Sequence, residues 1–159
     1  QFIMKRIQNP WLGGILIGFY NRARELKIDF MLDRESSLEE LSPHIESNYV
    51  VSILGNLITN AFEAIERNHE HNKKVRMFVT DIGEEILIEV EDSGQGVHDE
   101  IITSIFYKGF STKAGEKRGY GLAKVKELVE DLNGSIAIEK GDLGGALFII
   151  ALPKERGEL

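Results

Sequence analysis

The 159-residue chain contains no cysteine, so disulfide bonds and thiolate metal sites are excluded. Only 8% of its residues are aromatic, and its apolar stretch at 11–20 has about ten residues, against the roughly 20 that a membrane-spanning helix needs. Basic charge is not in excess either. With 26 acidic and 19 basic residues the net charge is −7, which argues against nucleic-acid binding and gives no reason to expect direct membrane contact. What is present, 42% apolar and 28% charged residues, is ordinary for one folded domain.

The spacing of apolar residues predicts long helices and strands in separate parts of the chain. Ser47 or Asn48 is expected to cap the second helix. This arrangement favours an α+β two-layer sandwich, in which helices cover one face of a mixed, mostly antiparallel sheet. The expected helices span 11–26, 47–67 and 121–132, with a short helical piece at 99–106, and the expected strands span 28–33, 75–82, 85–91, 135–140 and 146–152.

Two asparagines interrupt the apolar face of the second helix. Asn56 and Asn60 are four residues apart, so their side chains leave the helix on the same side. An amide oxygen is a hard, neutral ligand suited to magnesium, which usually shares its coordination shell with substrate phosphates. The alternative is that both side chains only bond to nearby backbone.

Three further segments carry residues suited to a nucleotide. Asp92-Ser-Gly94-Gln-Gly96 follows directly on a strand, where a carboxylate can accept a hydrogen bond from an exocyclic amine and glycines let the backbone approach a planar ring. The alternative is a glycine-rich turn. Gly119-Tyr120-Gly121 precedes Leu122 and a helix, whose first N–H groups form an anion site. Between them, Ser111, Thr112, Lys113 and Arg118 offer hydroxyls and positive charge to phosphate, or else form a solvated loop.

Taken in order, these patterns resemble one ATPase superfamily. Asn-x-x-x-Asn-Ala on a helix, Asp-x-Gly-x-Gly after a strand, Phe-x-x-x-Phe, and Gly-x-Gly-Leu opening a helix resemble the superfamily of gyrase, heat-shock chaperones, histidine kinases and mismatch-repair proteins. The resemblance covers about residues 47–153, including the closing Gly144-Gly145, although Ala146 replaces the threonine that often follows these glycines. It implies a Bergerat-type fold that binds ATP and Mg²⁺.

The resemblance also implies roles for individual residues. Asn60 would ligate magnesium, Asp92 would accept a hydrogen bond from the adenine amine, and residues 106–118 would form a lid over ATP. The candidate catalytic residues are Asn56 and Lys113. The candidate nucleotide contacts are Asn56, Asn60, Asp92, Gly94, Gly96, Ser111, Thr112, Lys113, Arg118, Gly119, Tyr120, Gly121 and Leu122.

Two features are similar to the histidine kinases of this superfamily. Hydrolytic members place a glutamate, the general base, where this chain has Asn56, and an amide cannot take a proton from water. Asn9-Pro10-x-x-Gly13-Gly-x-Leu16-x-Gly18 followed by Arg22-Ala-Arg24-Glu25 resembles sensor kinases for four-carbon dicarboxylates and citrate. This resemblance implies a cytoplasmic domain of a parent protein anchored in the bacterial membrane.

The expected organisation has three parts. Residues 1–46 lead from a dimerisation segment and pack on the same domain, residues 47–153 form the ATP-binding catalytic core, and residues 154–159 form a polar tail. The acceptor histidine would lie on a dimerisation helix upstream of Gln1, and a response regulator would act downstream. Two alternatives are a non-catalytic nucleotide-binding regulatory module and an ATPase of the same superfamily, the latter disfavoured by Asn56.

Overall fold

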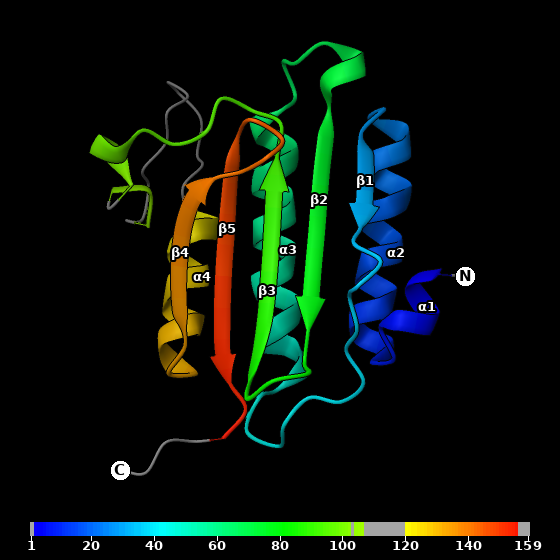
Figure 1. Cartoon of the computed structure of the whole chain (residues 1–159), viewed down its shortest axis with the longest axis vertical. Helices are drawn as coiled ribbons and strands as arrows, with labels where there is room; N and C mark the ends of the chain where they lie inside the picture. The colour runs from blue at the N-terminus through cyan, green and yellow to red at the C-terminus, as the bar shows by residue number, and fades with distance from the viewer. Residues whose placement is uncertain (1, 103, 107–119, 156–159) are drawn as a thin grey trace.

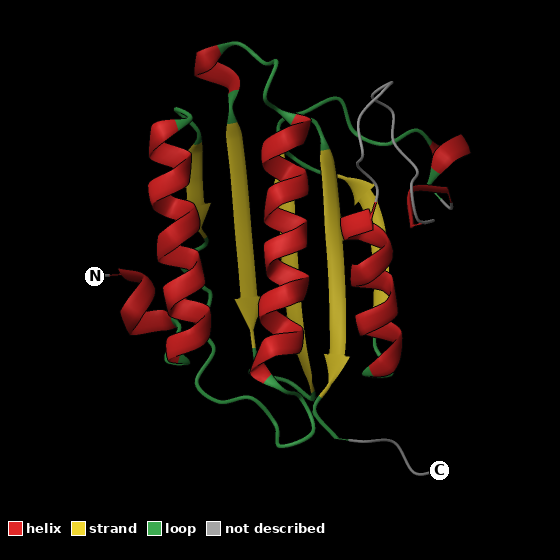
Figure 2. Ribbon diagram, turned by 180° about the vertical axis from the view of Figure 1, so that it is seen from behind, coloured by secondary structure: helices red, strands yellow, loops and turns green. Residues whose placement is uncertain are grey.

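The computed structural model describes residues 2–102, 104–106 and 120–155. In these ranges a five-stranded sheet carries helices α2, α3 and α4 on one face, while the other face has no helix over it (Figures 1 and 2). The strand order is β1-β2-β3-β5-β4, with β1 parallel to β2 and the other neighbours antiparallel. The predicted two-layer sandwich with a mixed, mostly antiparallel sheet is therefore confirmed.

The elements lie close to their predicted positions. The helices are α1 (Phe2–Arg6), α2 (Pro10–Glu25), α3 (Ser47–Ala64) and α4 (Tyr120–Asp131). The strands are β1 (Asp29–Leu32), β2 (Lys74–Thr80), β3 (Glu85–Asp92), β4 (Ser135–Lys140) and β5 (Ala146–Pro153). Single 3-10 turns occur at η1 (Glu70–Asn72), η2 (Asp99–Ile101) and η3 (Ser104–Phe106). The expected helical piece at 99–106 is thus two separate turns rather than one helix.

Local chemistry explains where the long helices begin and end. Asn9 caps α2 by accepting hydrogen bonds from the N–H groups of Trp11 and Leu12, at 3.0 and 3.2 Å. The predicted cap of α3 is wrong, because Ser47 is already helical and its hydroxyl accepts a hydrogen bond from the Asn9 amide at 3.1 Å. Helix α3 also stops at Ala64 instead of 67, since the following residues form three-residue turn bonds in place of helical ones.

Alternation along β3 divides its side chains between the two faces of the sheet. Ile86, Ile88 and Val90 are buried against the helices, and Asp92 continues this series at the end of the strand. Glu91 therefore points to the opposite face. The strand end thus presents one carboxylate to each side of the sheet.

The described helices give no candidate for a membrane span, since none combines the required length with enough apolar character.

Candidate functional site

Asp92 has the most perturbed environment of the predicted site residues that the structure describes. It is only 2% exposed, yet the Gly94 N–H donates to its Oδ1 atom at 2.8 Å and the Ala146 N–H also bonds to the carboxylate. Burial raises the pKa of Asp92 to about 6, against the lowering effect of these two hydrogen bonds. The group is therefore mostly ionised at neutral pH, and it is a strong acceptor in a nearly dry position.

Two glycines, Gly94 and Gly145, lie against this carboxylate and leave no room for side chains. A Cβ atom on Gly145 would lie 2.5 Å from the Asp92 carbonyl oxygen and would also collide with Oδ1. A Cβ atom on Gly94 would lie 2.9 Å from the same Oδ1 and 2.9 Å from the carbonyl oxygen of Ala64 in α3. Gly96 has a φ of +79°, a left-handed conformation that favours glycine. Of the predicted residues, the structure thus places Gly94 against Asp92, while Gly145 also contacts Asp92 and Gly96 lies beside Gly145.

Asn56 lies at the contact between α3 and α4. Its Nδ2 atom donates to the Ser52 carbonyl oxygen at 2.8 Å, so the alternative of bonding to nearby backbone holds for one half of the amide. Its Oδ1 atom lies 2.9 Å from the position that a Cβ atom on Gly121 would take. Only glycine permits this close approach of the amide oxygen to the first turn of α4.

Helix α3 separates two clusters of polar groups by a defined length: the Asp92 cluster with Gly94, and the Asn56 cluster with Gly121. Gly94 lies against Ala64, whereas Gly121 lies against Asn56, two turns earlier in the same helix. At 1.5 Å per residue, these two contacts are about 12 Å apart along the helix axis. Asn60 is partly exposed and occupies the intervening turn on the Asn56 side. The arrangement suits an elongated ligand whose two ends differ in chemistry.

The remaining predicted residues are described in part. Leu122 is buried and belongs to the hydrophobic core, and Tyr120 is placed as the first helical residue of α4. Phe106, the expected start of the lid, has the Lys126 ammonium 5.6 Å from its ring centroid, which ties η3 to α4. Ser111, Thr112, Lys113, Arg118 and Gly119 lie outside the described residues.

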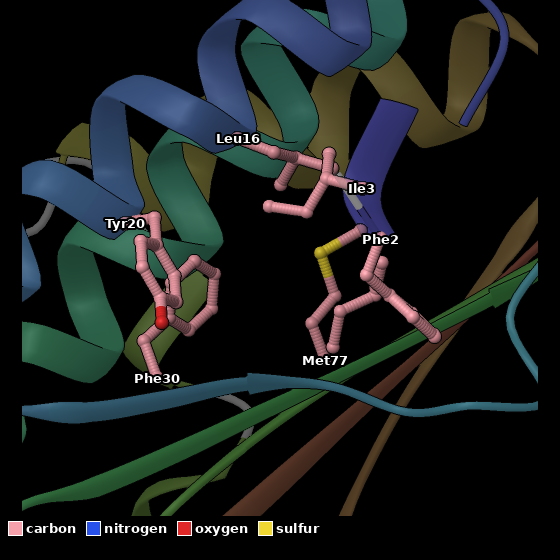
Figure 3. Close-up of a pocket in the computed structure, with 7 residues that line it drawn as sticks. Phe2, Ile3, Leu16, Tyr20, Phe30 and Met77 are labelled. Carbon is pink, nitrogen blue, oxygen red and sulfur yellow. The ribbon is translucent and has the colours of Figure 1, made fainter. Parts of the chain in front are cut away.

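A separate cavity of about 190 Å³ lies between α1, α2 and the first two strands (Figure 3). Its lining is apolar apart from Tyr20, with side chains such as Leu16, Phe30 and Met77 around it. No charged or amide side chain contributes to the lining. This cavity therefore cannot hold a triphosphate, and the polar clusters along α3 are the better candidate site.

Comparison with known proteins identifies the family. Residues 46–156 match the model of the "Histidine kinase-, DNA gyrase B-, and HSP90-like ATPase" family. The chain belongs to this ATPase family. The match covers the Asp92 cluster, α3 and the start of α4, so the two polar clusters are parts of the family's ATP-binding domain.

Individual relatives are histidine kinases or sensor proteins. The chain is 40% identical over 158 residues to the sensor protein CitS of Halalkalibacterium halodurans, covering 99% of this chain and 29% of the relative. It is 36% identical to the sensor histidine kinase DcuS of Escherichia coli, over 95% of this chain and 27% of the relative. Among solved structures it is similar to the nucleotide-free catalytic domain of histidine kinase ThkA, with a TM-score of 0.74, 27% identity and coverage of 92% and 91%. The chain thus spans less than a third of the length of these curated relatives.

Three parts of this candidate site were absent from the predicted residues. They are Gly145, the N–H of Ala146 and the carbonyl oxygen of Ala64, all placed around Asp92 or Gly94. Two of them are backbone groups, which leave no signal in the residue type. The Gly144-Gly145 pair was the available signal, because a glycine that opens a strand indicates a close backbone approach.

Proposed function

We propose that the chain is the ATP-binding catalytic domain of a sensor histidine kinase, which transfers the γ-phosphoryl group of ATP to a histidine on a dimerisation helix of its parent protein. One observation carries the proposal. The buried Asp92 and the Asn56–Gly121 contact lie at two ends of one stretch of α3, with Asn60 between them. This spacing fits a ligand with a nucleobase at one end and phosphates at the other.

Each end has residues suited to its part of the nucleotide. The ionised Asp92 would accept a hydrogen bond from the adenine amine, while Gly94 and Gly96 keep side chains away from the base. At the other end, the first N–H groups of α4 would face the phosphates beside Gly121. These local groups would offset the net charge of −7, which by itself repels a polyanion.

The amide oxygens of Asn56 and Asn60 fit a magnesium site that is completed by phosphates. Asn60 would be the metal ligand and Asn56 would lie beside the phosphates, because both oxygens leave α3 on one side. Magnesium would neutralise charge on the phosphates when bound. On sequence grounds, Ser111, Thr112, Lys113, Arg118 and Gly119 would complete the phosphate end, with Lys113 as a catalytic contact.

Transfer is favoured over hydrolysis by the residue at position 56. The Asn56 amide has no basic site that could take a proton from an attacking water, and its Nδ2 atom is already bonded to Ser52. Similarity to the sensor protein CitS of Bacillus subtilis and to a probable C4-dicarboxylate sensor kinase of Halalkalibacterium halodurans supports the same assignment. We therefore place the parent protein among membrane-anchored sensors of such acids, with this domain in the cytoplasm and a response regulator downstream. Residues 1–46 would link the core at 47–153 to the dimerisation helices.

The test is to titrate the chain with ATP and magnesium and then incubate the parent protein with γ-labelled ATP. We expect saturable binding and a label on a histidine outside this chain. Sustained phosphate release without labelled histidine would support an ATPase instead. Binding with neither reaction would support a regulatory module, and the absence of ATP binding would refute the proposed function altogether.

A further inference from the structure

The turn between β4 and β5 is fastened to the end of β3 by a backbone contact and by a side-chain contact. In the plane of the sheet, the Gly145 N–H donates to the Asp92 carbonyl oxygen at 3.1 Å. On the face to which Glu91 points, the Leu143 N–H donates to the Glu91 carboxylate at 3.1 Å. Two consecutive residues of β3 therefore hold one short turn, and the Glu91 contact is made by a side chain that has no place in the site so far.

Glu91 is unusual for a carboxylate on the face of the sheet without helices. It is only 4% exposed, and its second oxygen accepts a hydrogen bond from Arg76 Nη1 at 2.9 Å. Arg76 in turn donates through Nη2 and Nε to Asp33, at 2.7 and 3.2 Å. This series of contacts fixes the Glu91 carboxylate from β1 through β2, so its position is set independently of the turn that it holds.

The turn transmits this position to the site within a few residues. Gly141 donates to the Gly145 carbonyl oxygen at 2.9 Å, and Gly144 donates to the Gly141 carbonyl oxygen at 3.1 Å. These bonds make residues 141–145 one closed unit. At one end of the unit, a Cβ atom on Gly141 would lie 3.2 Å from Glu91 Oε1, and at its other end Gly145 presses on Asp92. A displacement of Leu143 must therefore move Gly145 and the Ala146 N–H that bonds to Asp92.

Stability alone is a weak reason to bury the Glu91 carboxylate beside an arginine that is itself only partly buried. Desolvation of a carboxylate and a guanidinium offsets most of their attraction, and apolar replacements are often as stable. A fixed carboxylate does, however, hold a backbone N–H in one place through a charge-assisted hydrogen bond. The buried Glu91 is thus better explained by the position of the turn than by the stability of the sheet.

We propose that Glu91 is a positioning residue for base recognition: it holds Leu143, and through the 141–145 turn it aligns Gly145 and Ala146 so that Asp92 selects an adenine amine. This inference rests on the proposed function, because it assumes that Asp92 binds the base of ATP. It assigns to Glu91 a share of the preference for ATP over inosine triphosphate, which has the same phosphates but lacks the exocyclic amine.

The experiment compares three variants of the chain. Glu91→Ala removes both contacts, Glu91→Gln keeps an oxygen that can accept from Leu143, and Glu89→Ala is the control. Glu89 lies on the same face of β3 and 4.0 Å from the same Arg76 nitrogen, but two residues farther from the turn. Calorimetric titrations with ATP and with inosine triphosphate measure the base preference, and amide hydrogen exchange at Leu143 reports the contact directly.

We expect Glu91→Ala to weaken ATP binding by about tenfold and Glu91→Gln by about threefold, the scale of one polar contact. Binding of inosine triphosphate should change by less than about twofold in both variants, and Glu89→Ala should alter neither ligand beyond that range. Exchange at Leu143 should accelerate most in Glu91→Ala and less in Glu91→Gln. If Glu91→Ala does not unfold cooperatively on heating, that variant is not properly folded. The nucleotide preference of the isosteric Glu91→Gln variant then tests the proposal.

The two possible failures are distinguishable. If the unmodified chain does not bind ATP, the proposed function fails. If it binds ATP, and folded Glu91 variants keep the ATP preference of the unmodified chain, the positioning role is overturned and the proposed function stands. Equal losses for both nucleotides would also overturn it, because a purely structural defect does not discriminate between bases.

Discussion

Replacing Asp92 with asparagine should stabilise the nucleotide-free protein and at the same time weaken ATP binding. The carboxylate is buried at the end of β3, and its pKa is raised from 3.8 to about 6. A raised pKa of an acid means that the folded state prefers the neutral form. An asparagine side chain has nearly the same shape but cannot ionise, so it removes this conflict while losing the charged acceptor for the adenine amine.

The sign and size of the stability effect follow from proton linkage. Below about pH 4 the group is protonated in both the folded and the unfolded state, and its ionisation costs nothing. Between pH 4 and 6 the unfolded chain loses the proton first, so the free energy of unfolding falls as pH rises. Above pH 6 the full cost is present, about 3 kcal/mol at ~1.4 kcal/mol per pKa unit. We expect Asp92→Asn to recover about 1–3 kcal/mol at pH 7.5, since its amide accepts the Gly94 and Ala146 N–H groups less strongly.

The assay is urea denaturation of both nucleotide-free proteins between pH 5 and pH 8, with calorimetry of ATP binding at pH 7.5. Other groups titrate in this range, so the measured quantity is the difference in unfolding free energy between the two proteins. This difference should increase with pH up to about pH 6 and then stay constant. At pH 7.5 the dissociation constant of ATP should be about 5- to 30-fold higher for Asp92→Asn than for the unmodified chain. A difference that does not vary with pH, or a variant less stable than the parent at pH 7.5, would refute the account of Asp92.

Three further predictions concern other parts of the site. Gly121→Ala places a Cβ atom 2.9 Å from Asn56 Oδ1, so calorimetry should show weaker binding of ATP and ADP but unchanged binding of adenosine. Asn60→Ala should abolish the gain in ATP affinity that magnesium provides, and an equal loss with and without a chelator would contradict the ligand role. Gly145→Ala overpacks the Asp92 end and should lower the free energy of unfolding by about 1–3 kcal/mol in thermal denaturation. Gly83→Ala is its control, because no atom lies within 4 Å of the added Cβ.

The sequence predicted those features that depend on local spacing. Asp92 and Gly94 are neighbours in the chain, and Asn56 and Asn60 are one helical turn apart, so each pair could be placed from its own segment. Strand β4 was predicted with its observed bounds for the same reason. The parallel pairing of β1 with β2 and the contact of Gly145 with Asp92 join distant segments, which no local pattern specifies.

Glu91 shows a different limit of sequence reasoning. Alternation along β3 puts it on the face without helices, where a polar residue is normally exposed. It is buried because Arg76 from β2 and the turn after β4 cover it. In the sequence Glu91 therefore looks like a solvent-exposed charged residue, because its contacts with Arg76 and Leu143 come from distant segments.

A carboxylate in an ATP site introduces electrostatic repulsion with the phosphates, and the length of α3 reduces this repulsion. In the proposed complex, the Asp92 carboxylate at the adenine amine would repel the phosphates if both were close: two like charges 4 Å apart interact by about 4 kcal/mol at an effective dielectric constant of 20. At about 12 Å, the separation that two turns of α3 impose between the Gly94 and Gly121 contacts, the same repulsion falls to about 1.4 kcal/mol and is further screened by salt. In the proposed complex the Asn56 amide lies at the phosphate end and the Asn60 amide lies in the intervening turn, and neutral ligands there add no further negative charge beside the phosphates. The protein can thus keep an ionised Asp92 for base recognition, because a rigid helix keeps that charge away from the phosphate end.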